Sequence, residues 1–461
     1  MTSGNIFNLF WKFVFPSVIG VLVAGILEII DGLFIGNALG SQGLAGITLA
    51  YPPYIIIVGI GVLIGTGSSS LTALELGKGD NKGVHDIVNN TFLLCLLAGA
   101  VLTVSGLFFC ETSISLLGSS GQVLNYAREY LRITFMGSFF MVLTLALIPL
   151  IRTDGKPNLC MNIMIAGVFT NIVLDYLFVM QMGMGMSGAA TATVVSFFLT
   201  AVLLTYYLFR NKTKLKLQLR TTEVKIGTLK QILQAGLPSF MMQISLALVL
   251  FAYNYILLIY SSELEVSAYG IIGYMCSIFY MLFEGIALGV QPIIGFNYGA
   301  GNYERVSKTL RLSILSCILI GAFGFVLVYM FPESIVKIFS RNDSELMEVT
   351  LRGMNIMMLS LLAEGIVLLT TIYYQSINRV KTALFINLGK TFVLLLPLLF
   401  ILPSFLGLDG VWFASPVAEY IMAVVVLGML SKEFTTLKNG KEETERNSRT
   451  VTYKRAQKIE A

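Results

Sequence analysis

Acidic side chains inside apolar stretches are the residues of this sequence that could carry chemistry. The segment NIVLDYLFV, from Asn171 to Val179, places a carboxylate in an otherwise apolar run, four residues after an asparagine. If such a run crosses a membrane, a charge at its centre costs on the order of 2.5–3.5 kcal/mol on insertion scales, so it marks a pathway, a pair or a cavity. The ionisable residues of this kind are Glu28, Asp31, Asp175, Glu284, Glu364, Lys390 and Glu419.

Two pairs of these polar residues have helical spacing. Asn171 and Asp175 share one helix face, and Glu28 and Asp31 share another, so Asp31 and Asp175 could converge within one bundle. Such a cluster has two interpretations. In the first, a protonated aspartate hydrogen-bonds Asn171 and joins two helices. In the second, burial and a like-charged neighbour favour the protonated form enough for H+ to be bound and released, or the same oxygens bind Na+.

The composition is that of a membrane protein. Of the 461 residues, 56% are hydrophobic and 12% are charged, and the mean hydropathy is +0.80. Soluble domains have roughly 25% charged residues. Apolar stretches of the length that spans a bilayer, such as residues 92–109, recur along nearly the whole chain. The net charge of +5 does not indicate a nucleic-acid partner, because the basic residues gather in one loop and in the tail after residue 430.

We predict twelve transmembrane helices with both termini in the cytoplasm. In this topology the loops on the cytoplasmic side hold most of the loop Lys and Arg residues, as the positive-inside rule requires. The predicted spans are 13–36, 47–73, 88–110, 130–151, 158–181, 187–209, 231–259, 268–294, 309–331, 350–374, 382–402 and 409–430.

The two halves of the chain form a weak internal repeat. Sliding the second half by 222 residues aligns Pro16 with Pro238, Gly67 with Gly289, and GKGD at 77–80 with GAGN at 299–302. Each half has six spans, so both insert in the same orientation. We therefore expect an all-α integral membrane fold of two six-helix bundles related by a pseudo-two-fold axis along the membrane normal. The expected divisions are an N-lobe at 1–209, a basic cytoplasmic connection at 210–230, a C-lobe at 231–430, and a charged cytoplasmic tail at 431–461.

Several motifs resemble one transporter family. From about residue 20 to 430 the chain looks like the multidrug and toxic compound extrusion (MATE) transporters, particularly their DinF-like bacterial branch. The motifs that carry this resemblance are EIIDGLFIGNALG at 28–40, RTDGKPNLCMNIMIAGVFTNIVLDYLF at 152–178, GMSGAATAT at 185–193 and QPIIGFNYGAGN at 291–302. The resemblance implies two lobes around a central cavity that opens alternately to each side. It also implies cation-driven export from the bacterial inner membrane.

The resemblance also assigns residues to roles. Asp31, Asn171, Asp175 and Thr193 fall where that branch has its N-lobe coupling site for H+ or Na+, and Pro16 falls where the first helix bends. We expect no cofactor and no metal site, apart from Na+ at Asp31, Asn171 and Asp175. Glu28 and Lys390 depart from the family pattern. We expect the remaining buried charges to shape the substrate cavity: Glu28, Glu284, Glu364 and Lys390. A pair between Glu364 and Lys390 is an open alternative, and Glu419 is expected to be structural.

The expected function is a cation-coupled antiporter, exporting amphiphilic and cationic drugs or toxic compounds, that acts as a monomer. Nucleotide-binding and hydrolase motifs are missing: GKT at 389–391 lacks the glycine that a P-loop has five residues earlier. Two alternatives stay open. One is a flippase for a lipid-linked saccharide, although such a protein would need a basic rather than an acidic cavity. The other is a membrane enzyme or scaffold that transports nothing.

Overall fold

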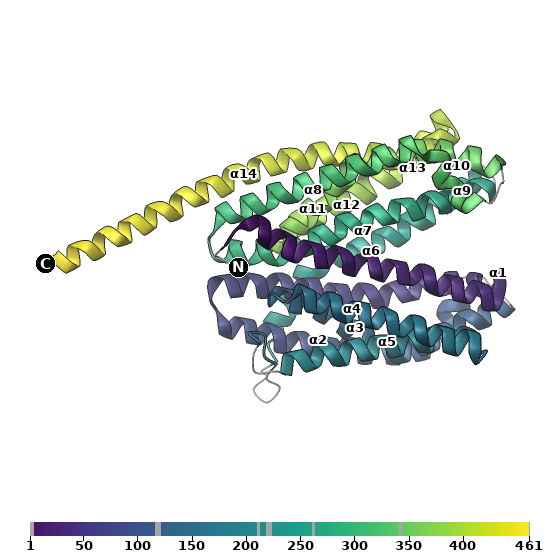
Figure 1. Ribbon diagram of the computed structural model, residues 1–461, viewed down its shortest axis with the longest axis horizontal. Helices are drawn as coiled ribbons and strands as arrows, with labels where there is room; N and C mark the ends of the chain where they lie inside the picture. Colours follow the sequence, from purple (N-terminus) through teal and green to yellow (C-terminus); the bar gives the residue numbers. More distant parts are fainter. Residues whose placement is uncertain are drawn as a thin grey trace.

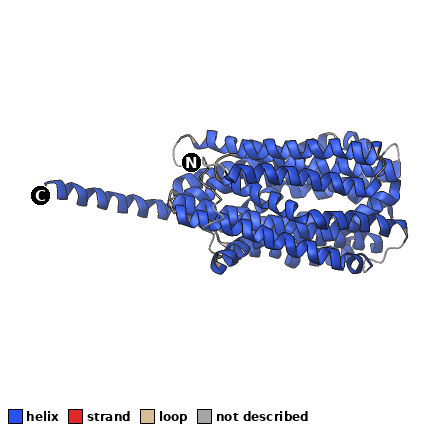
Figure 2. Cartoon of the chain, turned by 90° about the horizontal axis from the view of Figure 1, so that it is seen from below, coloured by secondary structure: helices blue, strands red, loops and turns tan. Residues whose placement is uncertain are grey.

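The computed structural model describes residues 4–460 except 116–120, 210–212, 218–223, 261–262 and 341–343. The regular structure of this part of the chain is helical throughout (Figure 2). The α-helices, labelled in Figure 1, are α1 Ile6–Lys78, α2 Asn81–Ser115, α3 Gln122–Thr153, α4 Pro157–Asp175, α5 Gly185–Phe209, α6 Ile226–Tyr260, α7 Glu263–Gly299, α8 Tyr303–Met330, α9 Pro332–Ser340, α10 Ser344–Met357, α11 Leu361–Ser376, α12 Val380–Leu388, α13 Leu396–Leu406 and α14 Leu408–Glu460. Short π-helical segments, η1 Tyr176–Gln181 and η4 Gly389–Leu395, continue α4 and α12, and a 3₁₀ turn, η3 Met358–Ser360, joins α10 to α11.

Helix α1 crosses the membrane twice. Its 73 residues would measure about 110 Å if straight, more than three times the roughly 30 Å hydrocarbon core of a bilayer. The chain reverses at Gly40, whose φ of 64° and ψ of −156° are accessible only to glycine, and Leu44 then lies beside Gly36. Eleven helices of the described residues are long and apolar enough to span a membrane. With the double crossing of α1, the chain makes the twelve crossings that the sequence predicts.

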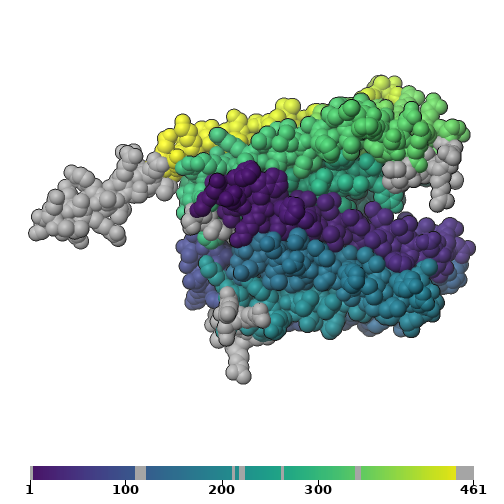
Figure 3. All heavy atoms as spheres, viewed as in Figure 1, coloured from purple at the N-terminus to yellow at the C-terminus, as the bar shows by residue number. Residues whose placement is uncertain are grey.

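Two clusters of buried hydrophobic side chains divide the molecule. One draws its members from residues 35–235, and the other from 252–437 together with Phe10 and Val14. We call residues 1–209 the N-terminal half and 231–430 the C-terminal half. The first helix of each half reaches into the cluster of the other half: Phe10 packs with the C-terminal half, and Ile232, its equivalent in the 222-residue repeat, packs with the N-terminal half. Figure 3 shows the first crossing of α1, in purple, along the seam between the halves.

The close backbone contacts between the two halves follow the same repeat. A Cβ atom built on Gly77 would lie 2.1 Å from the carbonyl oxygen of Phe296, and one built on Gly299 would lie 2.2 Å from that of Leu74. Both the two glycines and the two carbonyl groups are 222 residues apart, so the two contacts are equivalent under the pseudo-two-fold axis. Only glycine permits helices to approach so closely.

The halves are in contact at one end of the bundle and apart at the other. Val18 of α1 contacts Gly285 of α7. Ile29 lies on the same face of α1 as Val18, three turns later, and its side chain is 45% exposed. Ile278 lies on the same face of α7 as Gly285, and it is 42% exposed. We call the end that holds the N-terminus and the loops near residues 79 and 301 the closed end, and the opposite end the open end.

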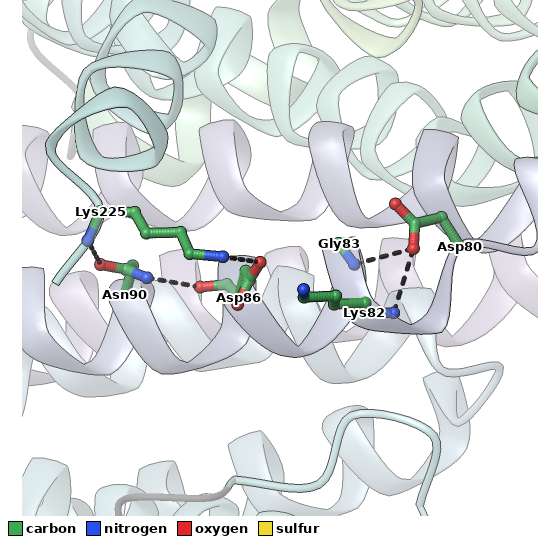
Figure 4. Close-up of polar contacts among 6 residues, drawn as sticks. All are labelled: Asp80, Lys82, Gly83, Asp86, Asn90 and Lys225. Carbon is green, nitrogen blue, oxygen red and sulfur yellow. Dashed lines mark hydrogen bonds and ion pairs between the residues drawn. The ribbon is translucent and has the colours of Figure 1, made fainter. Parts of the chain in front are cut away.

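The basic connection between the halves is attached to the closed end of the N-terminal half. Lys225 forms an ion pair with Asp86 of α2 at 2.5 Å, and its backbone N–H donates to Asn90 Oδ1 at 3.2 Å (Figure 4). The same picture shows the start of α2, where Asp80 Oδ1 accepts from the N–H groups of Lys82 and Gly83 as a helix N-cap does. Residues 210–212 and 218–223 of the predicted connection lie outside the described residues.

The last helix, α14, runs from the open end past the closed end (Figures 1 and 2). Near the closed end its side chains contact other segments of the C-terminal half. Glu433, 3% exposed, forms a 2.6 Å ion pair with Arg379 and accepts a hydrogen bond from the Tyr373 hydroxyl. Lys441 forms a further ion pair with Glu304 at 3.0 Å.

Candidate functional site

Asp31, Asn171 and Asp175 meet inside the N-terminal half. In the amide orientation that satisfies its neighbours, Asn171 Nδ2 donates to Asp31 Oδ1 at 2.9 Å and to Asp175 Oδ2 at 3.0 Å. The two carboxyl groups also lie within hydrogen-bonding reach of each other. Asn171 and Asp175 are essentially inaccessible to solvent, at 0% and 1% exposure. The convergence expected from helical spacing is therefore present in the structure.

The cluster lacks a cationic partner among the described side chains. A deprotonated carboxylate only accepts hydrogen bonds, so two carboxyl groups in contact are satisfied when a proton or a cation lies between them. Asp175 Oδ1 is buried and receives no hydrogen bond from a described donor. The arrangement can therefore hold one H+ or one small cation such as Na+. It has the oxygen ligands that either ion would use.

Helix α5 completes the cluster through its backbone. The N–H of Thr193 donates to Asn171 Oδ1 at 3.1 Å, whereas the Thr193 hydroxyl donates to Ala189 O in its own helix. Thr193 therefore belongs to the site through its backbone N–H and not through its hydroxyl. Tyr130 of α3 was not predicted. Its hydroxyl lies beside that of Thr193. The feature of the sequence that could have identified it is a tyrosine at the start of the predicted span 130–151.

A second group of charges lies in the C-terminal half. Lys390 forms an ion pair with Glu419 at 2.7 Å, with side chains 24% and 6% exposed. Glu364 of α11 interacts electrostatically with both. The structure therefore pairs Lys390 with Glu419 rather than with Glu364. Glu419, expected to be structural, is thus a member of this charged group.

A third group lies where the two halves come together. Glu284 of α7 interacts with Arg152 of α3 and with Glu28 of α1. Glu28 is exposed, and Glu284 is half-buried. Arg152, which the sequence places in a loop, is 3% exposed at the end of α3. The acids expected to line the cavity are therefore divided: Glu28 and Glu284 lie at the seam, and Glu364 lies with Lys390.

Both π-helical segments begin beside an ionisable residue. Segment η1 follows directly after Asp175, and η4 contains Lys390. A π-helical turn inside an α-helix is uncommon and often lies at a functional position. Pro16, the predicted bend, lies inside α1, whose only non-helical backbone is at Gly40. The bend at Pro16 stays a prediction.

Comparison with known proteins places the chain in a family. A statistical model of the MatE family matches it twice, at residues 16–177 and 238–401, with the 222-residue offset of the internal repeat. The multidrug export protein MepA of Staphylococcus haemolyticus is 27% identical over 425 residues, covering 92% of this chain and 93% of that protein. MepA of Staphylococcus aureus (strain MSSA476) is 25% identical over 422 residues, covering 92% and 93%.

Solved structures have the same fold. One is a multidrug resistance MATE family transporter of the MOP superfamily in an outward-facing conformation, with a TM-score of 0.90 and 24% identity over 95% of this chain and 97% of that one. Another is a MOP superfamily transporter from Pyrococcus furiosus, with a TM-score of 0.89 and 24% identity over 94% and 97%. Since the family model covers more than half of the sequence, this chain belongs to the MatE family of membrane transporters, which are not enzymes.

Proposed function

We propose that the protein exports amphiphilic, cationic compounds in exchange for H+ or Na+. The observation that carries the proposal is the buried cluster of Asp31, Asn171 and Asp175, which holds two carboxyl groups to which no side chain in the described part of the chain supplies a fixed counter-charge. A permanent ion pair would make such a cluster structural. A cluster without one can gain and lose a cation, which is what coupling to an ion gradient requires.

The closed end is the cytoplasmic end in this proposal. The loops near residues 79 and 301 and the basic connection all lie at that end, and the positive-inside rule places such loops in the cytoplasm. The open end then faces outward, as it does in the structural relative described as outward-facing. In this state a cation from outside reaches Asp31 and Asp175 and neutralises them. Their attraction for a cationic substrate falls, and the substrate leaves.

The experiment is efflux from proteoliposomes under imposed gradients. Asp175→Asn keeps the shape of the side chain but removes its titration, so the variant should insert and fold normally yet lose export driven by either gradient. Asn171→Ala should retain part of the activity, since water can replace a neutral hydrogen-bond donor. Applying proton and sodium gradients separately to the wild type identifies the coupling ion.

A matched control is Asp409→Asn, the same substitution in an ion pair with exposed Arg352 on α10. It should export at the wild-type rate. Export by Asp175→Asn against a concentration gradient at the wild-type rate would show that the carboxylate is structural. The coupling site would then lie elsewhere, with Glu284 the next candidate.

A further inference from the structure

Arg152 is a buried cation that crosses the seam. It belongs to α3 of the N-terminal half, and its Nη1 donates to the carbonyl oxygen of Leu288 on α7 of the C-terminal half at 3.3 Å. Leu288 is four residues after Glu284, so both lie on one face of α7, the face toward Arg152. The guanidinium and the Glu284 carboxylate interact electrostatically, although the hydrogen bond goes to the backbone. The N-terminal half thus supplies the cation, and the C-terminal half supplies the carbonyl oxygen that it binds and the carboxylate beside it.

The charges around Glu284 come from both halves. Arg152 is of opposite sign, Glu28 on α1 is of the same sign, and the other titratable neighbour on α7 is Tyr280, one turn before Glu284. Next to this group, Gly25 of α1 contacts Met281. Glu284 therefore lies within the last two packed turns of the seam, before the exposed Ile278 toward the open end. A cationic substrate that has entered the cavity would meet Glu28 and Glu284 there.

We propose that Arg152 is a built-in counter-ion that competes with the cationic substrate for Glu284. A fixed cation beside a carboxylate lowers the attraction of that carboxylate for a second cation. With the closed end sealed, Arg152 lies beside Glu284 and offsets its charge, and the cavity holds its substrate weakly. When the closed end opens, α3 and α7 separate, because each belongs to a different half. Glu284 then loses Arg152 and joins Glu28 as an uncompensated acid.

This exchange gives the protein a high affinity for its substrate while the closed end is open and a low affinity while it is sealed, as export requires. Substrate is taken up where Glu284 is free and is released where Arg152 has returned. The inference rests on the proposed export of cations, but it assigns a different role from the one proposed for Asp31 and Asp175. Those residues respond to the coupling ion, whereas Arg152 responds to the separation of the halves.

The test is the binding of tetraphenylphosphonium to full-length protein, reconstituted with the open end facing the bulk solution. Arg152→Gln should bind this cation about tenfold or more tightly than the wild type, because Glu284 has lost its competitor. Arg152→Lys keeps the charge and should bind like the wild type. Neutral triphenylphosphine oxide should bind all three proteins equally. An equal gain for the neutral compound would overturn the proposal, since a change in cavity shape would then explain both results.

The second arm does not depend on the folding of Arg152→Gln. The double variant Arg152→Gln/Glu284→Gln removes both charges of the pair and leaves Glu28 as it is in the wild type, so it should bind the cation within about twofold of the wild type. Glu284→Gln leaves Arg152 without a carboxylate and should bind the cation no more tightly than the wild type. A tenfold gain in the double variant would show that the gain does not come through Glu284, and Arg152 would not be its competitor. Failure of the proposed function is seen separately, as absence of tetraphenylphosphonium export by the wild type under either gradient.

Discussion

Gly299→Ala should shift the protein toward the state in which the closed end is open. The added Cβ atom would lie 2.2 Å from Leu74 O, and relief of that overlap requires the two helices to separate by about 1 Å. Overpacking of this kind costs about 1–3 kcal/mol. The helix-propensity gain of alanine, up to about 1 kcal/mol, is the same in the sealed and the open state and cancels. A cost of about 2 kcal/mol, the middle of that range, falls on the sealed state alone and corresponds to a shift of roughly 30-fold in the equilibrium.

The assay is the rate at which a maleimide labels a cysteine placed at Ser70, in a chain whose native cysteines have been replaced. Ser70 is 0% exposed, and its hydroxyl accepts a hydrogen bond from Gln291 across the seam at 3.0 Å. Labelling therefore requires the closed end to open. In the Gly299→Ala protein the rate should rise roughly 30-fold, in proportion to the open population.

Two further variants make the comparison specific. Gly77→Ala is the equivalent substitution in the other half, and it should raise the labelling rate to a similar extent. Gly270→Ala lies on the same helix as Gly299, but its Cβ atom would have nothing within 4 Å, so labelling should stay at the wild-type rate. If Gly299→Ala labels no faster than Gly270→Ala, the two halves do not seal through direct backbone contact, and the reasoning fails.

Three other outcomes are expected. Lys390→Met alone should destabilise the protein by about 3 kcal/mol, because it leaves Glu419 buried without its partner. In a thermal melt, the double variant Lys390→Met/Glu419→Gln should recover most of the lost stability. If it recovers none, loss of the ion pair is not the cause of the destabilisation. A cysteine at Lys214, which is exposed in the basic connection, should react with an impermeant reagent only from the cytoplasmic side, and labelling in intact cells would refute the proposed orientation. Cationic amphiphiles should be exported and anionic ones of equal size should not, and equal export of both would count against an acidic cavity.

The meeting of Asp31 with Asp175 was accessible from sequence because regular helices constrain position. The i,i+4 spacing of Asn171 and Asp175 fixes their common face, and the order of the spans fixes their depth. The twelve crossings follow from hydropathy in the same way. The 222-residue offset, read mainly from glycine and proline, reappears in the equivalent contacts of Gly77 and Gly299. These are properties that depend on local periodicity or on backbone geometry.

The partners of the other charges could not be read from the sequence. Whether Lys390 reaches Glu364 or Glu419 depends on how three helices are rotated about their axes, and the π-helical turn at Lys390 changes that rotation locally. Arg152 lies near a span boundary, where a shift of one turn decides between solvent and interior. In both cases the outcome is set by side-chain packing between distant segments.

The exchange of first helices between the halves has a consequence for synthesis in the membrane. Phe10 and Val14 pack against α7, which leaves the ribosome roughly 270 residues later. At about 5–20 residues per second, the nascent N-terminal half waits on the order of tens of seconds before this partner exists. During that time lipid tails cover the face that α7 will cover. Because acyl chains are as apolar as the side chains that replace them, the exposed face is tolerated during insertion. The late-arriving C-terminal half must then displace lipid to complete the fold.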